Sequence, residues 1–140
     1  MSHEAEDSNR RLLRARDAMD REYARPLDVP ALAKIAMVSP AHFSRTFRDT
    51  FGETPHRYLQ RRRVERAMFM LVQSSSSVTD ICFDVGFNSL GTFSRTFSQI
   101  VGETPTEFRQ SHPAMPVPNC FVAKWTRPSS FGEDRTKERA

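Results

Sequence analysis

Cysteine, glycine and long apolar runs are scarce in this sequence of 140 residues, and these shortages exclude several classes of protein. Only two cysteines occur, Cys82 and Cys120, which are too few for a disulfide framework and lack the paired spacing of a zinc site. No apolar run is long enough to cross a membrane, and the polar, acidic start of the chain is unlike a signal peptide. We therefore expect a cytoplasmic protein that makes no contact with membranes.

The usual signatures of catalysis and of metal binding are also absent. The sequence has no paired histidines at ligand spacing, no glycine-rich phosphate loop and no nucleophile elbow. We expect neither an enzyme nor a bound metal or cofactor. Cys82 lies within an apolar helical pattern, which favours a packed thiol, and a redox pair with Cys120 is the alternative.

Charge is close to balanced, with 21 Lys and Arg against 17 Asp and Glu and a net charge of +4. Between residues 25 and 112 every basic side chain except Lys34 is an arginine. Arginine has a planar fork of donors that suits phosphates and guanine edges. This composition permits a nucleic-acid partner, and ordinary solvated helix faces are the alternative.

A repeat is the main feature that is present. The stretch HFSRTFRDTFGETPHRYLQ at residues 42–60 returns as TFSRTFSQIVGETPTEFRQ at residues 92–110, with ten identical letters. Val29 aligns with Val78 at an offset of 49, whereas the later stretches align at an offset of 50. The chain therefore contains a duplicated unit whose second copy has one extra residue in a turn.

Helix signals surround each copy. In the first copy, residues 8–24 have apolar side chains at helical spacing. Asp28 can cap a second helix over residues 29–38, and Ser39 can cap a third helix that ends at Gly52. A short helix, a tight turn and a second helix form the helix-turn-helix arrangement, in which the second helix is free to enter a DNA groove.

The same plan follows in the second half. A GETP corner opens a long helix over residues 55–73, and four serines at residues 74–77 form a turn before the second copy. A final short helix begins at Thr104, where Glu107 completes the spacing of a capping box. The expected segments are an N-terminal arm (1–9), a first helix-turn-helix subdomain (10–53), a linker helix (54–74), a second helix-turn-helix subdomain (75–112), and a Pro-rich, charged tail (113–140) with an apolar patch at 120–125.

Identical letters in the two copies are of two kinds. The phenylalanines and the GETP corners serve packing and turns. Ser44 with Arg45, and Ser94 with Arg95, lie off the apolar face of their helices, so core packing does not explain their presence in both copies. They indicate two copies of one nucleic-acid contact.

These motifs resemble the DNA-binding domain of the AraC/XylS family of bacterial transcription regulators, over about residues 10–110. The resemblance is carried by LAKIAMVSPAHFSRTFRDTFGETPHRYLQRRRVERA and by VTDICFDVGFNSLGTFSRTFSQIVGETPTEFR. It implies an all-α fold of seven helices, in which a long central helix joins two helix-turn-helix units. It also implies a sequence-specific regulator of transcription whose two recognition helices enter successive major grooves of double-stranded DNA. One chain could then bind as a monomer.

The resemblance also implies which residues contact DNA. The expected base contacts are Ala41, Ser44, Arg45 and Arg48 in the first copy, and Leu90, Gly91, Ser94 and Arg95 in the second. The expected phosphate contacts are Ser39, Arg57, Ser89, Thr104 and Arg109. Arg45 and Arg95 are the strongest candidates, because a guanidinium can grip guanine O6 and N7 together. Ala41, Leu90 and Gly91 depart from the larger side chains of some members, which reduces the hydrogen bonds available for reading bases.

Two other functions fit parts of the sequence. A helical adaptor would bind another protein, such as RNA polymerase or a second regulator, through the patch at residues 120–125 or a helix face. A DNA repair enzyme of the Ada type would need an activated cysteine, and the apolar neighbours of Cys82 and Cys120 argue against one. Because the chain begins a few residues before its first expected helix, it resembles the short family members that lack a sensor domain, although a fragment of a longer regulator would read the same.

Overall fold

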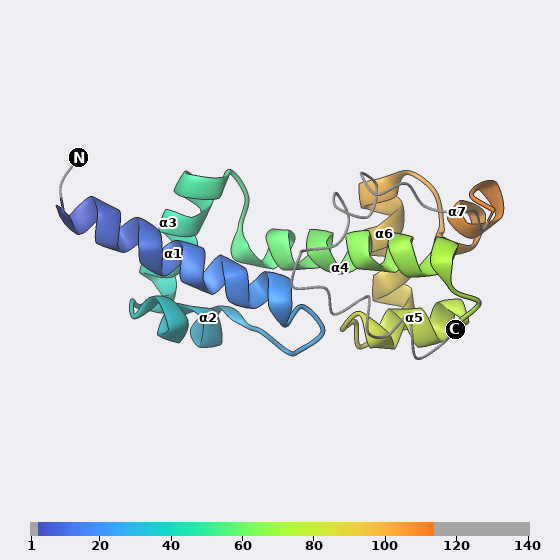
Figure 1. Ribbon diagram of the computed structural model, residues 1–140, viewed down its shortest axis with the longest axis horizontal. Helices are drawn as coiled ribbons and strands as arrows, with labels where there is room; N and C mark the ends of the chain where they lie inside the picture. Colours follow the sequence, from blue (N-terminus) through green and yellow to red (C-terminus); the bar gives the residue numbers. More distant parts are fainter. Residues whose placement is uncertain (1–2, 114–140) are drawn as a thin grey trace. The chain divides into compact units, whose positions relative to one another are not determined.

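The computed structural model of the protein describes residues 3–113, and in this part of the chain it contains seven helices and no strand (Figure 1). The helices are α1 (His3–Arg21), α2 (Val29–Ala36), α3 (Pro40–Phe51), α4 (Pro55–Gln73), α5 (Val78–Asp84), α6 (Leu90–Val101) and α7 (Pro105–Ser111). The predicted all-α class with seven helices and two helix-turn-helix units is confirmed. The apolar patch at residues 120–125 lies outside the described residues, as does nearly all of the predicted tail.

The chain divides into two compact units, Met1–Gln60 and Arg61–Ala140. The division falls within α4, inside the predicted linker helix, whose expected span of residues 55–73 agrees with the structure. Each unit contains one helix-turn-helix, formed by α2 and α3 in the first and by α5 and α6 in the second.

Aromatic side chains of α3 form the core of the first unit. Phe43 and Phe47 are fully buried, and the ring of Phe47 packs edge-on against Tyr58 with 5.7 Å between centroids. Residues four apart lie on the same face of a helix, so these two phenylalanines fix which face of α3 points inward. The opposite face is left to solvent.

Helix α1 is longer at its start and shorter at its end than the predicted span of residues 8–24. The predicted N-terminal arm was wrong from His3 onward, because Glu4 and Glu6 in the first turn favour a helix and Asp7 pairs with Arg11 at 2.8 Å. The helix ends at Arg21, where a tight turn precedes the proline at position 26.

The turn between α2 and α3 places a methionine in an unusual backbone conformation. Met37 has φ 58° and ψ 44°, and its N–H donates to the carbonyls of Ala33 and Lys34 at the end of α2. The matching position in the second unit is Gly86, with φ 105°. Glycine adopts this left-handed region freely, whereas methionine does so at a cost in free energy.

The second unit repeats the aromatic core. Phe93 and Phe97 are fully buried on α6, and Phe97 packs edge-on against Phe108 of α7 with 5.7 Å between centroids. Ser77 caps α5 by accepting from the N–H of Asp80 at 3.0 Å. The predicted capping box at the start of α7 is also present. The two units therefore present α3 and α6 in the same way, with the phenylalanines inward.

Candidate nucleic-acid interface

Helix α3 presents four of the predicted contact residues. Its start is fixed by Ser39, whose hydroxyl accepts from the N–H of His42 at 3.2 Å. With the phenylalanines inward, Ala41, Arg45 and Arg48 are exposed, and Ser44 is half-buried at the edge of the core. The exposed face of α3 thus carries two arginines, and the side chain of Ala41 near its N-terminus is small.

Helix α6 presents the second set in the same register. Ser89 caps it by accepting from the N–H of Thr92 at 3.2 Å. Leu90 is 40% exposed, Gly91 and Arg95 are exposed, and Ser94 is half-buried like Ser44. A Cβ added to Gly91 would meet only the hydroxyl of Ser89, at 3.7 Å, so core packing does not require glycine there.

Arg45 and Arg95 occupy equivalent places, each two residues after the first buried phenylalanine of its helix. Among residues 3–113, neither side chain is engaged in a hydrogen bond or an ion pair. An exposed guanidinium on the solvent-facing side of a helix can make a bidentate contact with a guanine edge or with a phosphate.

Arg57 lies at the start of α4 on an exposed position. Its own N–H donates to the hydroxyl of Thr54 at 3.2 Å, which fixes the first turn of the helix and leaves the guanidinium free to extend into solvent. Ser39, Ser89 and Arg57 all lie at helix starts, where the macrodipole is positive. Their predicted contact with phosphate is compatible with this geometry.

Thr104 and Arg109 have other roles. The N–H of Thr104 donates to the carboxylate of Glu107 at 2.8 Å, and its hydroxyl accepts from the N–H of Glu107 at 3.1 Å. Arg109 donates from Nε to the carbonyl of Leu71 at 3.0 Å and from Nη2 to that of Ser74 at 3.2 Å. The predicted phosphate contacts at these two residues stay predictions: Thr104 caps α7 as Ser39 and Ser89 cap their helices, and the guanidinium of Arg109 already donates to two backbone carbonyls.

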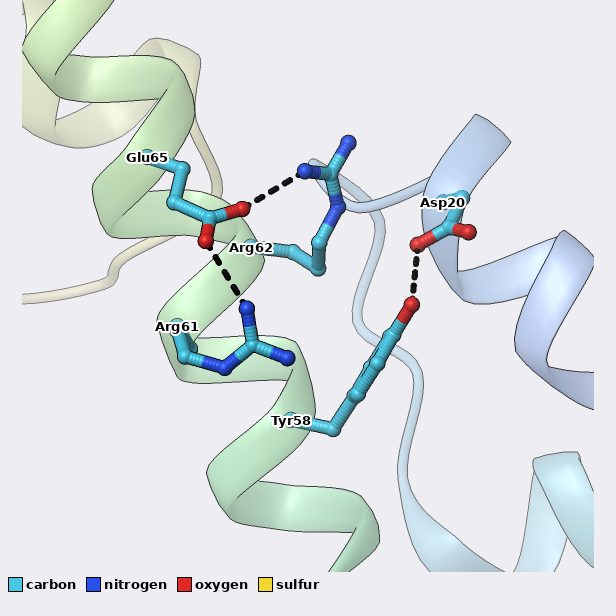
Figure 2. Close-up of polar contacts among 5 residues, drawn as sticks. All are labelled: Asp20, Tyr58, Arg61, Arg62 and Glu65. Atoms are coloured by element: carbon cyan, nitrogen blue, oxygen red, sulfur yellow. Dashed lines mark hydrogen bonds and ion pairs between the residues drawn. The ribbon is translucent and has the colours of Figure 1, made fainter. Parts of the chain in front are cut away.

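The arginine run on α4 is partly an internal network of the second unit. Figure 2 shows Arg61 and Arg62 converging on Glu65, with nitrogen–oxygen distances of 2.8 Å and 2.6 Å. Glu65 thus pairs with two members of this run. Arg66 is buried, with its guanidinium 4.7 Å from the ring centroid of Phe69. These arginines serve the packing of α4.

Several exposed polar residues of the helix-turn-helix segments lie outside the predicted set of contacts, and Lys34 and Gln99 are two of them. Lys34 lies on α2, and Gln99 lies on α6 one turn after Arg95. Comparison of the two copies position by position shows that Lys34 has an apolar counterpart, Phe83. Spacing would have found Gln99, since residues four apart share a helix face.

Nothing in residues 3–113 groups three or more His, Cys, Asp or Glu side chains where they could hold a metal ion. Cys82 is fully buried, and desolvation raises the pKa of its thiol. A buried, protonated thiol is a poor nucleophile. Among the described helices, none is long and apolar enough to cross a membrane.

Comparison with known proteins gives a consistent set of matches. Residues 32–111 match the helix-turn-helix domain family. The HTH-type transcriptional regulator Rv1931c of Mycobacterium tuberculosis is 41% identical over 61 residues, which is 44% of this chain and 24% of that protein. The chain thus spans about a fifth to a quarter of the length of the first curated relatives it matches.

Solved structures with the same fold extend the match over most of the chain. A transcriptional regulator from Chromobacterium violaceum, described as an AraC-type DNA-binding domain-containing protein, has 31% identity and a TM-score of 0.70, and the match covers 79% of this chain and 97% of that one. The DNA-binding domain of the global transcriptional factor AdpA, solved with a target DNA, has 27% identity and a TM-score of 0.67, and the match covers 85% and 97%.

One curated relative combines regulation with chemistry. The bifunctional transcriptional activator/DNA repair enzyme AdaA of Bacillus subtilis is 35% identical over 68 residues, which is 49% of this chain and 32% of that protein. The similarity covers about a third of the length of that enzyme, so it does not extend the repair activity to this chain.

Proposed function

The chain belongs to the AraC-type helix-turn-helix family, and from that premise we propose that it regulates transcription by binding double-stranded DNA in a sequence-specific manner. Helices α3 and α6 enter successive major-groove segments as the two recognition helices. A helix-turn-helix places its second helix in the major groove with N-terminal residues at the base edges. The similar AdpA domain was solved in complex with a target DNA, which supports DNA binding by this chain.

A single observation carries the proposal. Arg45 and Arg95 are exposed at equivalent positions of α3 and α6, with no partner among residues 3–113. Two equivalent, uncommitted guanidinium groups on two helix-turn-helix units have no role in packing. They match the bidentate contact with guanine that is the commonest specific contact in protein–DNA complexes.

The remaining base contacts differ between the two helices. On α3, Ser44 and Arg48 add hydrogen-bond donors, with Arg48 able to reach a phosphate as well as a base edge, and Ala41 is small. On α6, Leu90 and Gly91 offer only apolar contact, for example with a thymine methyl, and Ser94 offers one hydroxyl. The second helix therefore depends mainly on Arg95 and on DNA shape.

Contacts with the DNA backbone and with proteins complete the proposal. Ser39, Ser89 and Arg57 contact phosphates. Because one chain contains both recognition helices, it binds its site as a monomer. A regulator also acts on the transcription machinery, so RNA polymerase or another regulator is the expected protein partner.

Site selection from a random duplex library tests this function. The purified chain should recover a motif with two short conserved blocks, and fluorescence anisotropy should show tighter binding to that motif than to a scrambled duplex at each salt concentration. A single-stranded oligonucleotide of the same sequence is the control. Failure to recover any motif, with equal affinity for the motif and the scrambled duplex, would exclude sequence-specific binding by this chain.

A further inference from the structure

The two repeats match in backbone and differ in charge. Residues 29–58 contain four basic and two acidic side chains, whereas the equivalent residues 78–108 contain one basic and four acidic ones. The formal charges are therefore +2 and −3. Double-stranded DNA carries one negative charge per about 1.7 Å of its axis, so the two repeats meet it with opposite electrostatics.

Three basic positions account for most of the difference, and Asp80 and Asp84 in the second repeat add to it. Lys34 on α2 corresponds to Phe83 on α5, Arg48 on α3 to Ser98 on α6, and Arg57 on α4 to Glu107 on α7. The three basic side chains are exposed, and so are Phe83 and Glu107, while Ser98 is half-buried. The equivalent positions are thus accessible in both copies, but their chemistry differs. Arg45 and Arg95 are the one basic pair that both copies keep.

Glu107 makes the contrast sharper. Its carboxylate accepts the N–H of Thr104 at 2.8 Å, and the hydrogen bonds with Thr104 lower its pKa. The group is charged at neutral pH and held in place at the start of α7. A phosphate approaching this corner of the second unit meets a fixed negative charge, whereas at the equivalent corner of the first unit it meets Arg57.

Taking the DNA-binding function proposed above as its basis, we infer that the first repeat (residues 29–58) anchors the phosphate backbone through Lys34, Arg48 and Arg57, whereas the second repeat (residues 78–108) adds sequence preference through Arg95 and little ionic affinity. Lys34 is a new contact in this assignment. The first helix of a helix-turn-helix crosses the DNA backbone, and α2 is that helix in the first unit.

This division of roles has a consequence for binding. Of the two repeats, the first displaces more of the counterions that DNA releases, so removing its basic side chains should reduce the salt dependence of binding. The second repeat binds stably only when the first is in place. Its contribution then distinguishes one sequence from another and adds little to non-specific affinity.

The test compares two triple variants of the full chain on a duplex of mixed sequence. Lys34→Gln/Arg48→Ser/Arg57→Gln removes the proposed anchors, and Arg10→Gln/Arg14→Gln/Arg21→Gln removes the same charge from exposed positions of α1. Each phosphate contact contributes about 0.9 to the magnitude of the slope of log K against log salt. The unmodified chain loses affinity when salt rises from 50 to 200 mM, and in the first variant, which lacks three contacts, this loss should be smaller by a factor of about 40. The α1 variant should leave that slope nearly unchanged. Circular dichroism and heat melting verify that both variants are folded.

Two results would overturn the division of roles. One is an unchanged salt slope in the anchor variant, and the other is an equal fall in slope in both triple variants, which would mean that net charge alone matters. A complementary variant, Phe83→Lys/Ser98→Arg, places basic residues on the second repeat. It should increase the slope of log K against log salt by the contribution of about two phosphate contacts. If the unmodified chain fails to bind any duplex, the proposed function itself fails. If the chain binds DNA but the salt slope does not change when Lys34, Arg48 and Arg57 are replaced, only the proposed division of roles between the two repeats is rejected.

Discussion

The hydroxyl of Tyr58 donates a hydrogen bond to a carboxylate oxygen of Asp20 at 2.8 Å, and both side chains are buried in the first unit (Figure 2). This contact joins the start of α4 to the end of α1. The counterpart of Tyr58 in the second unit is Phe108, which has no hydroxyl. The ring of Phe108 packs against Phe97 in the same way as the ring of Tyr58 packs against Phe47. The ring therefore serves packing in both units, and the hydroxyl serves Asp20.

Replacing Tyr58 with Phe should lower the free energy of unfolding by about 1.5–3 kcal/mol, because a hydrogen bond to a buried carboxylate is lost while the ring remains. Urea unfolding followed by circular dichroism measures the change. Combining it with Asp20→Asn in a double-mutant cycle separates the pair from other effects. A loss below about 0.5 kcal/mol would show that the hydroxyl contributes little.

Replacing Met37 with Gly should stabilise the first unit by about 1 kcal/mol, because a left-handed conformation costs methionine more than glycine. The side chain is 59% exposed, so little packing is lost. The matched change in the second unit, Gly86→Ala, should destabilise by a similar amount. Denaturant midpoints of the two variants should move in opposite directions, and movement in the same direction would contradict the strain at Met37.

Replacing Arg109 with Gln should destabilise the second unit by about 1–3 kcal/mol, since the carbonyls of Leu71 and Ser74 lose charged donors. The DNA affinity of the folded variant should stay within about twofold of that of the unmodified chain, because the guanidinium of Arg109 binds backbone carbonyls and does not bind a phosphate. Anisotropy at low temperature, where the variant is folded, tests this. A smaller salt slope would restore Arg109 to the phosphate contacts.

Glu107 should contribute to the free energy of unfolding at neutral pH and lose this contribution in acid. The hydrogen bonds with Thr104 lower the pKa of this carboxyl in the folded chain, so its contribution is present above the ordinary pKa of glutamate. The contribution is lost as pH falls through the folded-state pKa. The unfolding midpoints of the unmodified chain and of Glu107→Gln, which keeps the spacing of the cap, should differ at neutral pH and converge in acid. A constant difference at all pH values would contradict the assignment.

Local signals in the sequence predicted much of this fold. Ser39, Ser89 and Thr104 begin helices because a hydroxyl three residues before a free N–H is enough to cap a helix, and that relation is visible in the letters. The spacing of Phe43 and Phe47 likewise indicated the inward face of α3, and with it the exposed positions of the contact residues.

Relations between distant residues were not predictable in the same way. Arg109 bonds to carbonyls 35 and 38 positions earlier, so its role as a clamp depends on how α7 packs against the end of α4. The conformation of Met37 was also hidden, because methionine is not a residue that signals a left-handed turn. Only alignment with Gly86 in the second copy indicates it.

The most direct test of two recognition helices is repeated site selection with Arg45→Ala and Arg95→Ala, compared with the unmodified chain. Each variant should lose about 1–3 kcal/mol of binding free energy on the selected motif and should relax the base preference in one block only, with a different block for each arginine. If both variants instead recover the original motif unchanged and bind all sequences more weakly to the same extent, Arg45 and Arg95 contact phosphates, and the account of two base-reading helices is wrong.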